Sequence, residues 1–200
     1  MYIFALYYKW LVNKYMNPYE IIAKYYAPGS ELYEILVRHS EAVKDKALAL
    51  ARKHPELELD LEFIAEAAML HDIGILETDA AGIKCFGTHR YIEHGYLGAE
   101  MMRREGYPRH ALVCERHTGT GLKLADIIAR DLPVPHRELC PVSLEEQLIC
   151  YADKFFSKTR IDSEDSYERV EQKIKKWGEE SVEKLRCWKE MFEQGAGSRE

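Results

Sequence analysis

The chain has 200 residues, 46% of them hydrophobic, which is enough for one sizeable core and predicts a single domain. Its formal net charge is −6, and it has no basic tract that could follow a phosphate backbone, so we expect no nucleic acid polymer as a partner. A small anionic ligand stays compatible with this charge, because a cationic pocket can form locally in an acidic protein.

The five cysteines are widely spaced, odd in number and form no CxxC pair. They are Cys85, Cys114, Cys140, Cys150 and Cys187. This usage favours reduced thiols over a disulfide framework or a zinc knuckle, and we therefore expect a cytoplasmic protein.

Residues 1–12 are apolar and aromatic, but they contain Lys9 and are too short to span a bilayer. They also lack a basic leader and a small-residue cleavage site, so we expect no membrane span, and an interfacial role stays open. Met16 precedes Asn17-Pro18 and reads as a second plausible start. We interpret residues 1–16 as an N-terminal extension.

The first expected helix has Asn17 as its N-cap and ends before Ala27-Pro28-Gly29. Ser30 caps a longer helix that runs to about Lys53. Its apolar residues recur at steps of three and four and form one stripe, namely Leu32, Leu36, Val43, Ala47 and Leu50. His39 lies on that stripe, where it is either a hydrogen-bonded core histidine or a ligand.

Asp60 opens the next helix, which is apolar and ends in the adjacent pair His71-Asp72. Burial of this ionisable pair is costly unless a partner or a metal compensates it. Gly74 fits the helix C-terminus, where we expect a left-handed residue. Residues 79–93 show no clear period and are interpreted as an irregular, functional loop.

The remaining expected helices follow in short succession: His94 to Glu105, Ala111 to His117, Ala125 to Arg130, and one from Ser143 that carries Asp153 and Phe156. Ser143 and Glu146 form a capping-box pattern. Closing amphipathic helices, broken at Gly178, carry Trp177, Trp188 and Phe192, which fit either a homodimer interface or core packing. No period of two is convincing, so we predict an all-α, single-domain helical bundle.

Six polar residues recur at helix ends or on apolar helix faces: His39, His71, Asp72, His94, His117 and Asp153. Such a nitrogen and oxygen donor set suits divalent iron, manganese, zinc, nickel or cobalt. Six ligands are too many for one catalytic ion with an open position, but they suit two neighbouring ions that share a bridging carboxylate. We therefore expect two metal ions per chain.

His39, His71-Asp72 and Asp153 reproduce an H…HD…D pattern, and His71-Asp72-Ile73-Gly74 is its HDIG form. In these residues the chain resembles the HD-domain metal-dependent phosphohydrolases, in particular small stand-alone HDIG proteins of prokaryotes. The resemblance covers roughly residues 32–158. It implies a helical HD domain over 17–160, on which we expect the amphipathic helices of 161–200 to pack.

The resemblance also implies roles for the six residues. His39, His71, Asp72 and Asp153 would hold the first metal, and Asp72 would bridge to a second metal held by His94 and His117. From the residues alone, Asp153 could instead pair with Lys154 or Lys158, and His89 competes with His94 as a loop ligand. His54, His110 and His136 adjoin prolines or charged residues and are interpreted as surface positions.

Position 75 is Ile, where several HD proteins carry a lysine that could contact phosphate. Arg116 and Lys154 adjoin proposed ligands and are, with Asp72, the candidate catalytic residues. Candidate substrate contacts, each also readable as a solvated surface charge, are Lys84, Arg90, Lys123 and Lys158. Glu77 could relay protons or be an ordinary loop carboxylate.

The resemblance implies hydrolysis of a phosphate ester or anhydride in a small nucleotide-like substrate, by water activated at a binuclear site. The enzyme would be a phosphomonoesterase, a phosphodiesterase or a dinucleoside polyphosphate hydrolase. Three alternatives stay open: a nucleotide-sensing domain with little turnover, a di-iron oxygenase of the HD type, and a helical scaffold stabilised by its histidines.

Overall fold

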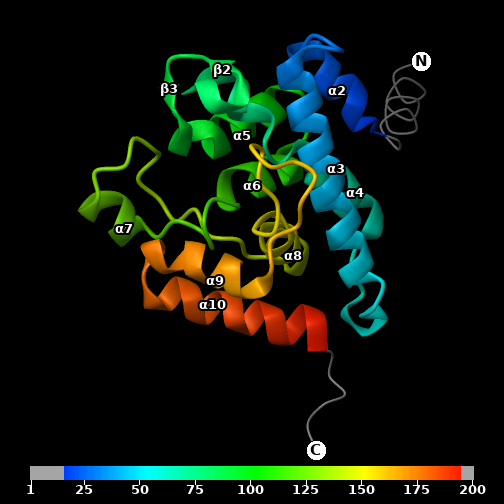
Figure 1. Ribbon diagram of the computed structural model, residues 1–200, viewed down its shortest axis with the longest axis vertical. Coiled ribbons are helices and arrows are strands. Elements are labelled where there is room, and N and C mark those ends of the chain that lie inside the picture. Colours follow the sequence, from blue (N-terminus) through cyan, green and yellow to red (C-terminus); the bar gives the residue numbers. More distant parts are fainter. Residues whose placement is uncertain (1–15, 195–200) are drawn as a thin grey trace, which may run out of the picture.

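A computed structural model describes residues 16–194, in which nearly all regular structure is helical (Figure 1). The predicted all-α class is therefore confirmed, apart from one small sheet. The predicted N-terminal extension lies, except for Met16, outside the described residues. None of the helices between residues 16 and 194 combines the length and apolar character that crossing a bilayer requires.

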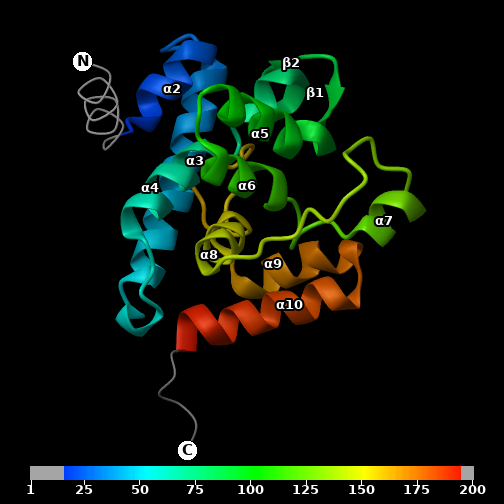
Figure 2. The same cartoon turned by 180° about the vertical axis from the view of Figure 1, so that it is seen from behind.

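The first three helices of the described residues start at the predicted caps: α2 spans Pro18–Tyr25, α3 spans Glu31–Ala51 and α4 spans Leu61–Leu70. The side chains of Asn17, Ser30 and Asp60 each accept a hydrogen bond from a backbone N–H of the first turn. Helices α3 and α4 lie side by side in both views (Figure 1, Figure 2). They carry the first two predicted ligands.

Three more helices complete the centre of the molecule: α5 (His94–Arg104), α6 (Pro108–Arg116) and α8 (Leu144–Asp153). The stretch from Leu148 to Ala152 is fully buried, which is expected of a helix covered on all sides. Ser143 caps α8, but the Glu146 carboxylate accepts from the backbone N–H of Val142 instead of closing the predicted capping box.

The predicted irregular loop contains a small sheet, which the sequence analysis missed. Strand β1 (Thr78–Ala80) pairs antiparallel with β2 (Cys85–Phe86) and parallel with β3 (His89–Arg90). The order is β2-β1-β3. Strands of two or three residues are too short to show an alternating pattern, so periodicity could not reveal them.

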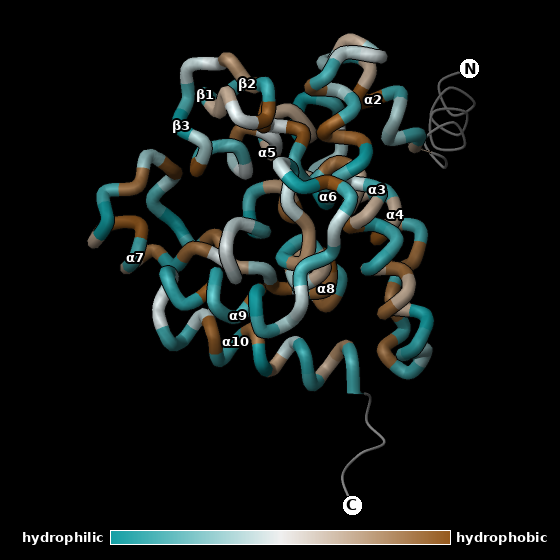
Figure 3. The backbone as a smooth tube through the Cα atoms, in the orientation of Figure 1, coloured by the Kyte–Doolittle hydropathy of each residue, from teal (hydrophilic) through white to brown (hydrophobic). Residues whose placement is uncertain are grey.

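The last two α-helices of the described residues are α9 (Tyr167–Ile174) and α10 (Glu179–Lys189). They lie side by side at the edge of the molecule opposite the sheet (Figure 1, Figure 2). The short 3₁₀ turn η5 (Lys175–Trp177) and Gly178, at φ = +100°, separate them as predicted. Their tubes alternate hydrophilic and hydrophobic colours, as expected of helices with one buried face (Figure 3). Helix α7 (Leu124–Ala129) projects from the side of the molecule (Figure 1).

The aromatic residues of the C-terminal helices differ in burial. Trp188 and Phe192 are each 1% exposed and belong to the core, so they offer no dimer surface. Trp177 is half-buried. Core packing is therefore the correct alternative for two of the three residues.

The apolar interior consists of two main clusters, and α3 and α4 pass from one to the other. One cluster includes Val43 and packs against α8, α9 and α10; the other includes Val37 and Leu70 and packs against α2 and α5. His39 lies between Val37 and Val43, and His71 follows Leu70. The candidate ligands thus lie where the two clusters meet.

Candidate metal centre

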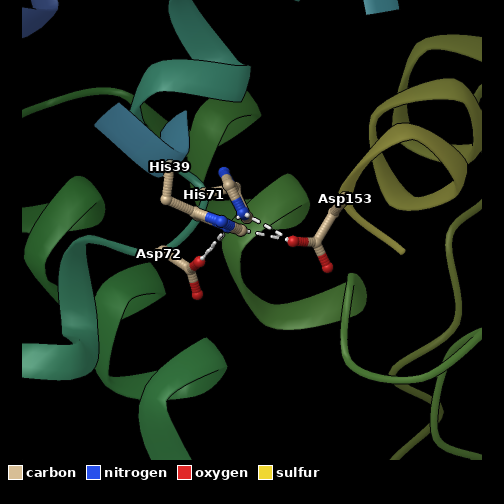
Figure 4. Close-up of side chains that lie close together, drawn as sticks. All are labelled: His39, His71, Asp72 and Asp153. Atoms are coloured by element: carbon tan, nitrogen blue, oxygen red, sulfur yellow. Dashed lines mark hydrogen bonds and ion pairs between the residues drawn. The ribbon is translucent and has the colours of Figure 1, made fainter. Parts of the chain in front are cut away.

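Four of the predicted ligands converge in a first group: His39 from α3, His71 at the end of α4, Asp72, and Asp153 as the last residue of α8 (Figure 4). The Nε2 atoms of both histidines lie 3.0 Å from Asp72 Oδ2. They lie 3.1 and 3.3 Å from Asp153 Oδ1. Two imidazoles and two carboxylates therefore aim at one small volume.

A second group consists of Asp72, His94 at the start of α5 and His117 at the end of α6. The Nε2 atoms of the two histidines are 3.0 Å apart, and each lies 3.4 Å from Asp72 Oδ1. Asp72 thus turns Oδ2 to the first group and Oδ1 to the second. This is the placement that a bridging carboxylate needs.

Three of the four histidines are oriented by a backbone carbonyl three residues earlier. His71 Nδ1 donates to the Ala68 carbonyl at 2.7 Å, His94 Nδ1 to Tyr91 at 2.6 Å, and His117 Nδ1 to Cys114 at 2.7 Å. Because these bonds place a proton on Nδ1, Nε2 is the nitrogen that points into the site and can bind a metal. Helix ends supply such free carbonyls.

The donor set fits metal ions. With protons on their Nδ1 atoms, His94 and His117 direct two lone pairs at each other over 3.0 Å, which is unfavourable unless a cation lies near both. Asp72 Oδ1 is buried without a hydrogen-bonding partner among the described residues. Nitrogen and oxygen donors in this arrangement are the ligands of divalent transition metals.

The two groups differ electrostatically. Burial opposes protonation of His71, but the adjacent Asp72 and the hydrogen bond to Asp153 prevail and raise its pKa to about 9. Burial, aided by the charges of His117 and Lys158 and opposed by Asp72, lowers the pKa of His94 to about 3. A metal ion entering the first group would therefore displace a proton, whereas the second group presents a neutral imidazole.

A cavity of about 620 Å³ opens onto the centre and exposes Asp153, His94 and His117. Four lysines line it: Lys154, Lys158, Lys173 and Lys176. Among the described lining residues, Asp153 is the sole carboxylate. This local excess of positive charge in an acidic chain favours a small anionic ligand.

Two of these lysines touch the predicted ligands. Lys154 Nζ lies 2.7 Å from Asp153 Oδ2 and donates to the His117 carbonyl at 2.9 Å. Lys158 forms an ion pair with Asp72 Oδ2. Burial opposes both charges, but Asp153 and Asp72 raise the pKa of Lys154 and Lys158, respectively, so both ammonium groups are charged.

The other predicted cationic residues do not line this cavity. Arg116 Nη1 lies 2.9 Å from Glu146 Oε2, and Lys84 Nζ lies 3.3 Å from Glu31 Oε2. Lys123 pairs with Glu180, and Arg90 is exposed. These four residues are therefore held away from the place where a ligand would meet the centre.

The remaining histidines have other surroundings. His89 lies 2.9 Å from Glu93 Oε1 and joins neither ligand group, and Glu77 is exposed and does not line the cavity. His136 is exposed, as predicted.

The surface prediction was wrong for His54 and His110, which are 4% and 8% exposed. His54 Nε2 donates to the Phe192 carbonyl at 3.0 Å, because the C-terminal segment covers it. His110 lies 3.1 Å from Glu66 Oε2 and packs edge-on against Phe63.

Gly74 is needed for a different reason than the one predicted. It lies in a 3₁₀ turn and does not have the expected positive φ. A Cβ at this position would lie 2.2 Å from the His94 carbonyl oxygen and 2.3 Å from the Gly98 nitrogen. The glycine therefore allows α5 to approach Asp72 closely enough for His94 to join the second group.

Two aromatic residues at the site were missed. Tyr91 stacks on His94, with ring centroids 4.7 Å apart, and Trp177 lines the far side of the cavity. The aromatic residue three positions before His94 was a signal that could have found Tyr91. No local pattern could have placed Trp177, because only the packing of the C-terminal helices brings it there.

Comparison with known proteins extends these observations. The model of the HD domain family matches residues 36–158. An uncharacterized protein of Methanocaldococcus jannaschii is 34% identical over 147 residues, which cover 72% of this chain and 79% of that protein. A tRNA (cytidine(56)-2′-O)-methyltransferase of Picrophilus torridus is 30% identical over 129 residues, 64% of this chain but only 33% of that protein. No solved structure matches significantly.

Proposed function

Because this chain belongs to the HD domain family, we propose that it hydrolyses a phosphate ester or anhydride in a small nucleotide-like substrate. The observation that carries this proposal is the position of Asp72, which turns one oxygen to each of two histidine groups. A shared carboxylate of this kind is typical of two-metal centres that act on phosphate groups.

The first group would hold one divalent ion through His39, His71, Asp72 and Asp153, and the second group would hold another through Asp72, His94 and His117. Such ions, when bound, lower the pKa of water and draw negative charge from a phosphoryl group. Iron, manganese, nickel, zinc and cobalt all suit these donors. The proposal of two ions per chain rests on the two groups that share Asp72.

The protein's own contribution is to place the phosphate and to neutralise its charge. Lys154 and Lys158 are charged and buried beside Asp153 and Asp72, which places two cations at the centre where a phosphoryl group would bind. The Nδ1 bonds of the histidines to backbone carbonyls keep the ligands in place while the substrate changes. Arg116, held by Glu146, is not assigned this role.

The size of the cavity supports a small substrate. A volume of about 620 Å³ lies within the usual range of small-molecule sites. The relative from Picrophilus torridus, of which this chain matches only 33%, is named for a reaction on a cytidine of tRNA, and this name suggests cytidine nucleotides as compounds to test. The test panel should therefore include cytidine phosphates, cyclic phosphates and dinucleoside polyphosphates.

The proposal is tested by measuring metal content and phosphate release on protein prepared without oxygen and reconstituted with each candidate metal. We expect about two ions per chain and turnover of at least one member of the panel. Asp72→Ala should remove both ions and the activity, while Asp72→Asn, which keeps the shape, should lose activity with the fold intact.

Other results would overturn the proposal in distinct ways. Two ions without turnover of any phosphate would favour a nucleotide sensor, and mixed-valence iron with consumption of oxygen would favour an oxygenase. Failure to bind metal after reconstitution would favour a purely structural role for the histidines.

A further inference from the structure

The cavity at the centre has two walls of different origin. The wall that carries His94, His117 and Asp153 lies within the family match, residues 36–158. The opposite wall comes from α9 and the turn η5, beyond that match. It consists of Val170, Lys173, Ile174, Lys176 and Trp177, and we call it the C-terminal wall.

Trp177 is the largest side chain of the C-terminal wall, and its indole packs against Gly119, which also lines the cavity. A Cβ on Gly119 would lie 3.4 Å from three atoms of the indole, so the ring rests against that backbone. The Arg130 guanidinium lies 5.5 Å from the ring centroid. Gly119 follows the ligand His117 by two residues, and the indole is thus held beside the segment that carries the second ligand group.

The two lysines of the C-terminal wall differ in whether they are paired with a carboxylate. Lys173 is paired with Asp165, a buried carboxylate that also binds Arg160. Lys176 is exposed, makes no ion pair with any described residue and lies 5.5 Å from the Trp177 ring centroid. The wall therefore contains a half-buried indole with the cations Lys176 and Arg130 beside it.

A ring of this kind in a cavity fits a planar partner. Tryptophan offers a large apolar surface with a geometric preference for stacking, and every nucleobase has a face that can stack on it. Ile174 and Phe156 add apolar surface to the lining, and the two lysines that touch the ligands line the same cavity. The lining thus combines cations at the metal centre with an aromatic surface.

We propose that the C-terminal wall determines substrate selectivity: Trp177 stacks on the nucleobase of a nucleoside phosphate while the phosphate group lies at the metal centre. Lys176 adds positive potential at the same wall and favours the approach of the anionic substrate. The inference rests on the proposed function. It adds that selectivity comes from a segment outside the family domain.

The test compares binding of two ligands that cannot be hydrolysed at the ester position. One is a nucleoside phosphonate, in its adenosine and cytidine forms, in which carbon replaces the ester oxygen; the other is the ribose phosphonate without a base. Binding to metal-loaded protein is measured by calorimetry. We expect the wild type to bind at least one nucleoside form about 10-fold tighter than the ribose form.

Trp177→Ala should remove this preference and leave the affinity for the ribose phosphonate unchanged. Trp177→Phe keeps an aromatic ring and packing against Gly119, so it should retain most of the preference even if the alanine variant is unstable. Phe86→Ala is the matched control, because Phe86 is 75% exposed and does not line the cavity. It should behave as the wild type.

Equal binding of both ligands by the wild type would overturn the inference while leaving phosphate chemistry intact. Equal weakening of both ligands in Trp177→Phe would also overturn it, because that result indicates a structural role. If neither phosphonate binds the metal-loaded protein, the proposed function itself fails and this inference fails with it.

Discussion

The two ligand groups share Asp72 but differ in depth and in completeness. The side chains of His39 and His71 are 1% and 0% exposed, and neither lines the cavity. His94 and His117 are 6% and 3% exposed and do line it. The first group supplies four residues and the second supplies three.

This difference indicates that the two ligand groups have different roles. An ion with four protein ligands is held firmly, whereas an ion with fewer protein ligands keeps more positions open for water or substrate. We therefore expect the first group to bind its metal more firmly and the second to face the reacting phosphate.

Substitution of one histidine in each group should distinguish the roles of the two groups in metal binding. His39→Ala and His94→Ala should both lower activity by about 100-fold or more, since loss of an outer partner alone costs about 10- to 100-fold. The metal content should differ: His94→Ala should retain about one ion that resists a chelator, and His39→Ala should retain no resistant ion. Metal analysis before and after chelation measures this. Equal retention of metal by the two variants after chelation would contradict different roles for the two groups.

Gly74→Ala should damage the second group through the backbone. The added Cβ would meet backbone atoms of His94 and Gly98, which cannot rotate away, so we expect a loss of about 2–4 kcal/mol in the free energy of unfolding. Binding of the second metal should weaken as well. Urea denaturation measures the effect. Gly82→Ala, where a Cβ meets nothing within 4 Å, is the control, and equal stability of the two variants would contradict the packing role.

Lys158→Met tests whether the cation beside Asp72 serves the substrate. We expect both metals to be retained and kcat/KM to fall by about 10- to 100-fold, since a charge near the developing phosphoryl charge is lost. Lys84→Met is the matched control, because Lys84 lies outside the cavity and should leave kcat/KM unchanged. An equal effect of both substitutions would show that only overall charge matters.

His110 gives a pH effect on stability that is separate from either group. Burial, with the charge of Arg109, lowers its pKa from 6.5 to about 4. Between pH 6.5 and pH 4 the unfolded chain therefore binds a proton at His110 that the folded chain does not. The contribution of neutral His110 to the free energy of unfolding is complete above pH 6.5 and is lost as the pH falls toward 4.

Between pH 7 and pH 5 the loss from His110 should be about 1–2 kcal/mol in the free energy of unfolding. His110→Gln should reduce this slope in urea denaturation. Burial raises the pKa of the neighbouring Glu66, so protonation of Glu66 stabilises the folded chain as the pH falls and opposes the effect of His110. Glu66→Gln should therefore steepen the dependence of the free energy of unfolding on pH. An unchanged slope in His110→Gln would show that other groups cause the acid sensitivity.

The sequence contained the local information about this fold. Caps such as Asn17, Ser30 and Asp60 start helices where expected, because a side chain and a backbone N–H a few residues apart decide a helix start. The apolar stripe of α3 predicted which face is buried. The six candidate ligands were chosen from their positions at helix ends and on apolar faces, and all six belong to the two groups.

Only the tertiary structure decided what these local elements meet. Arg116 is adjacent to a ligand in sequence yet turns to Glu146, while Lys158, five residues after Asp153, reaches Asp72. Trp177 reaches the cavity because α9 and α10 fold across α8. Side-chain direction and long-range packing fix such contacts. They depend on how whole helices cross, and the spacing of residues along one helix does not encode that crossing.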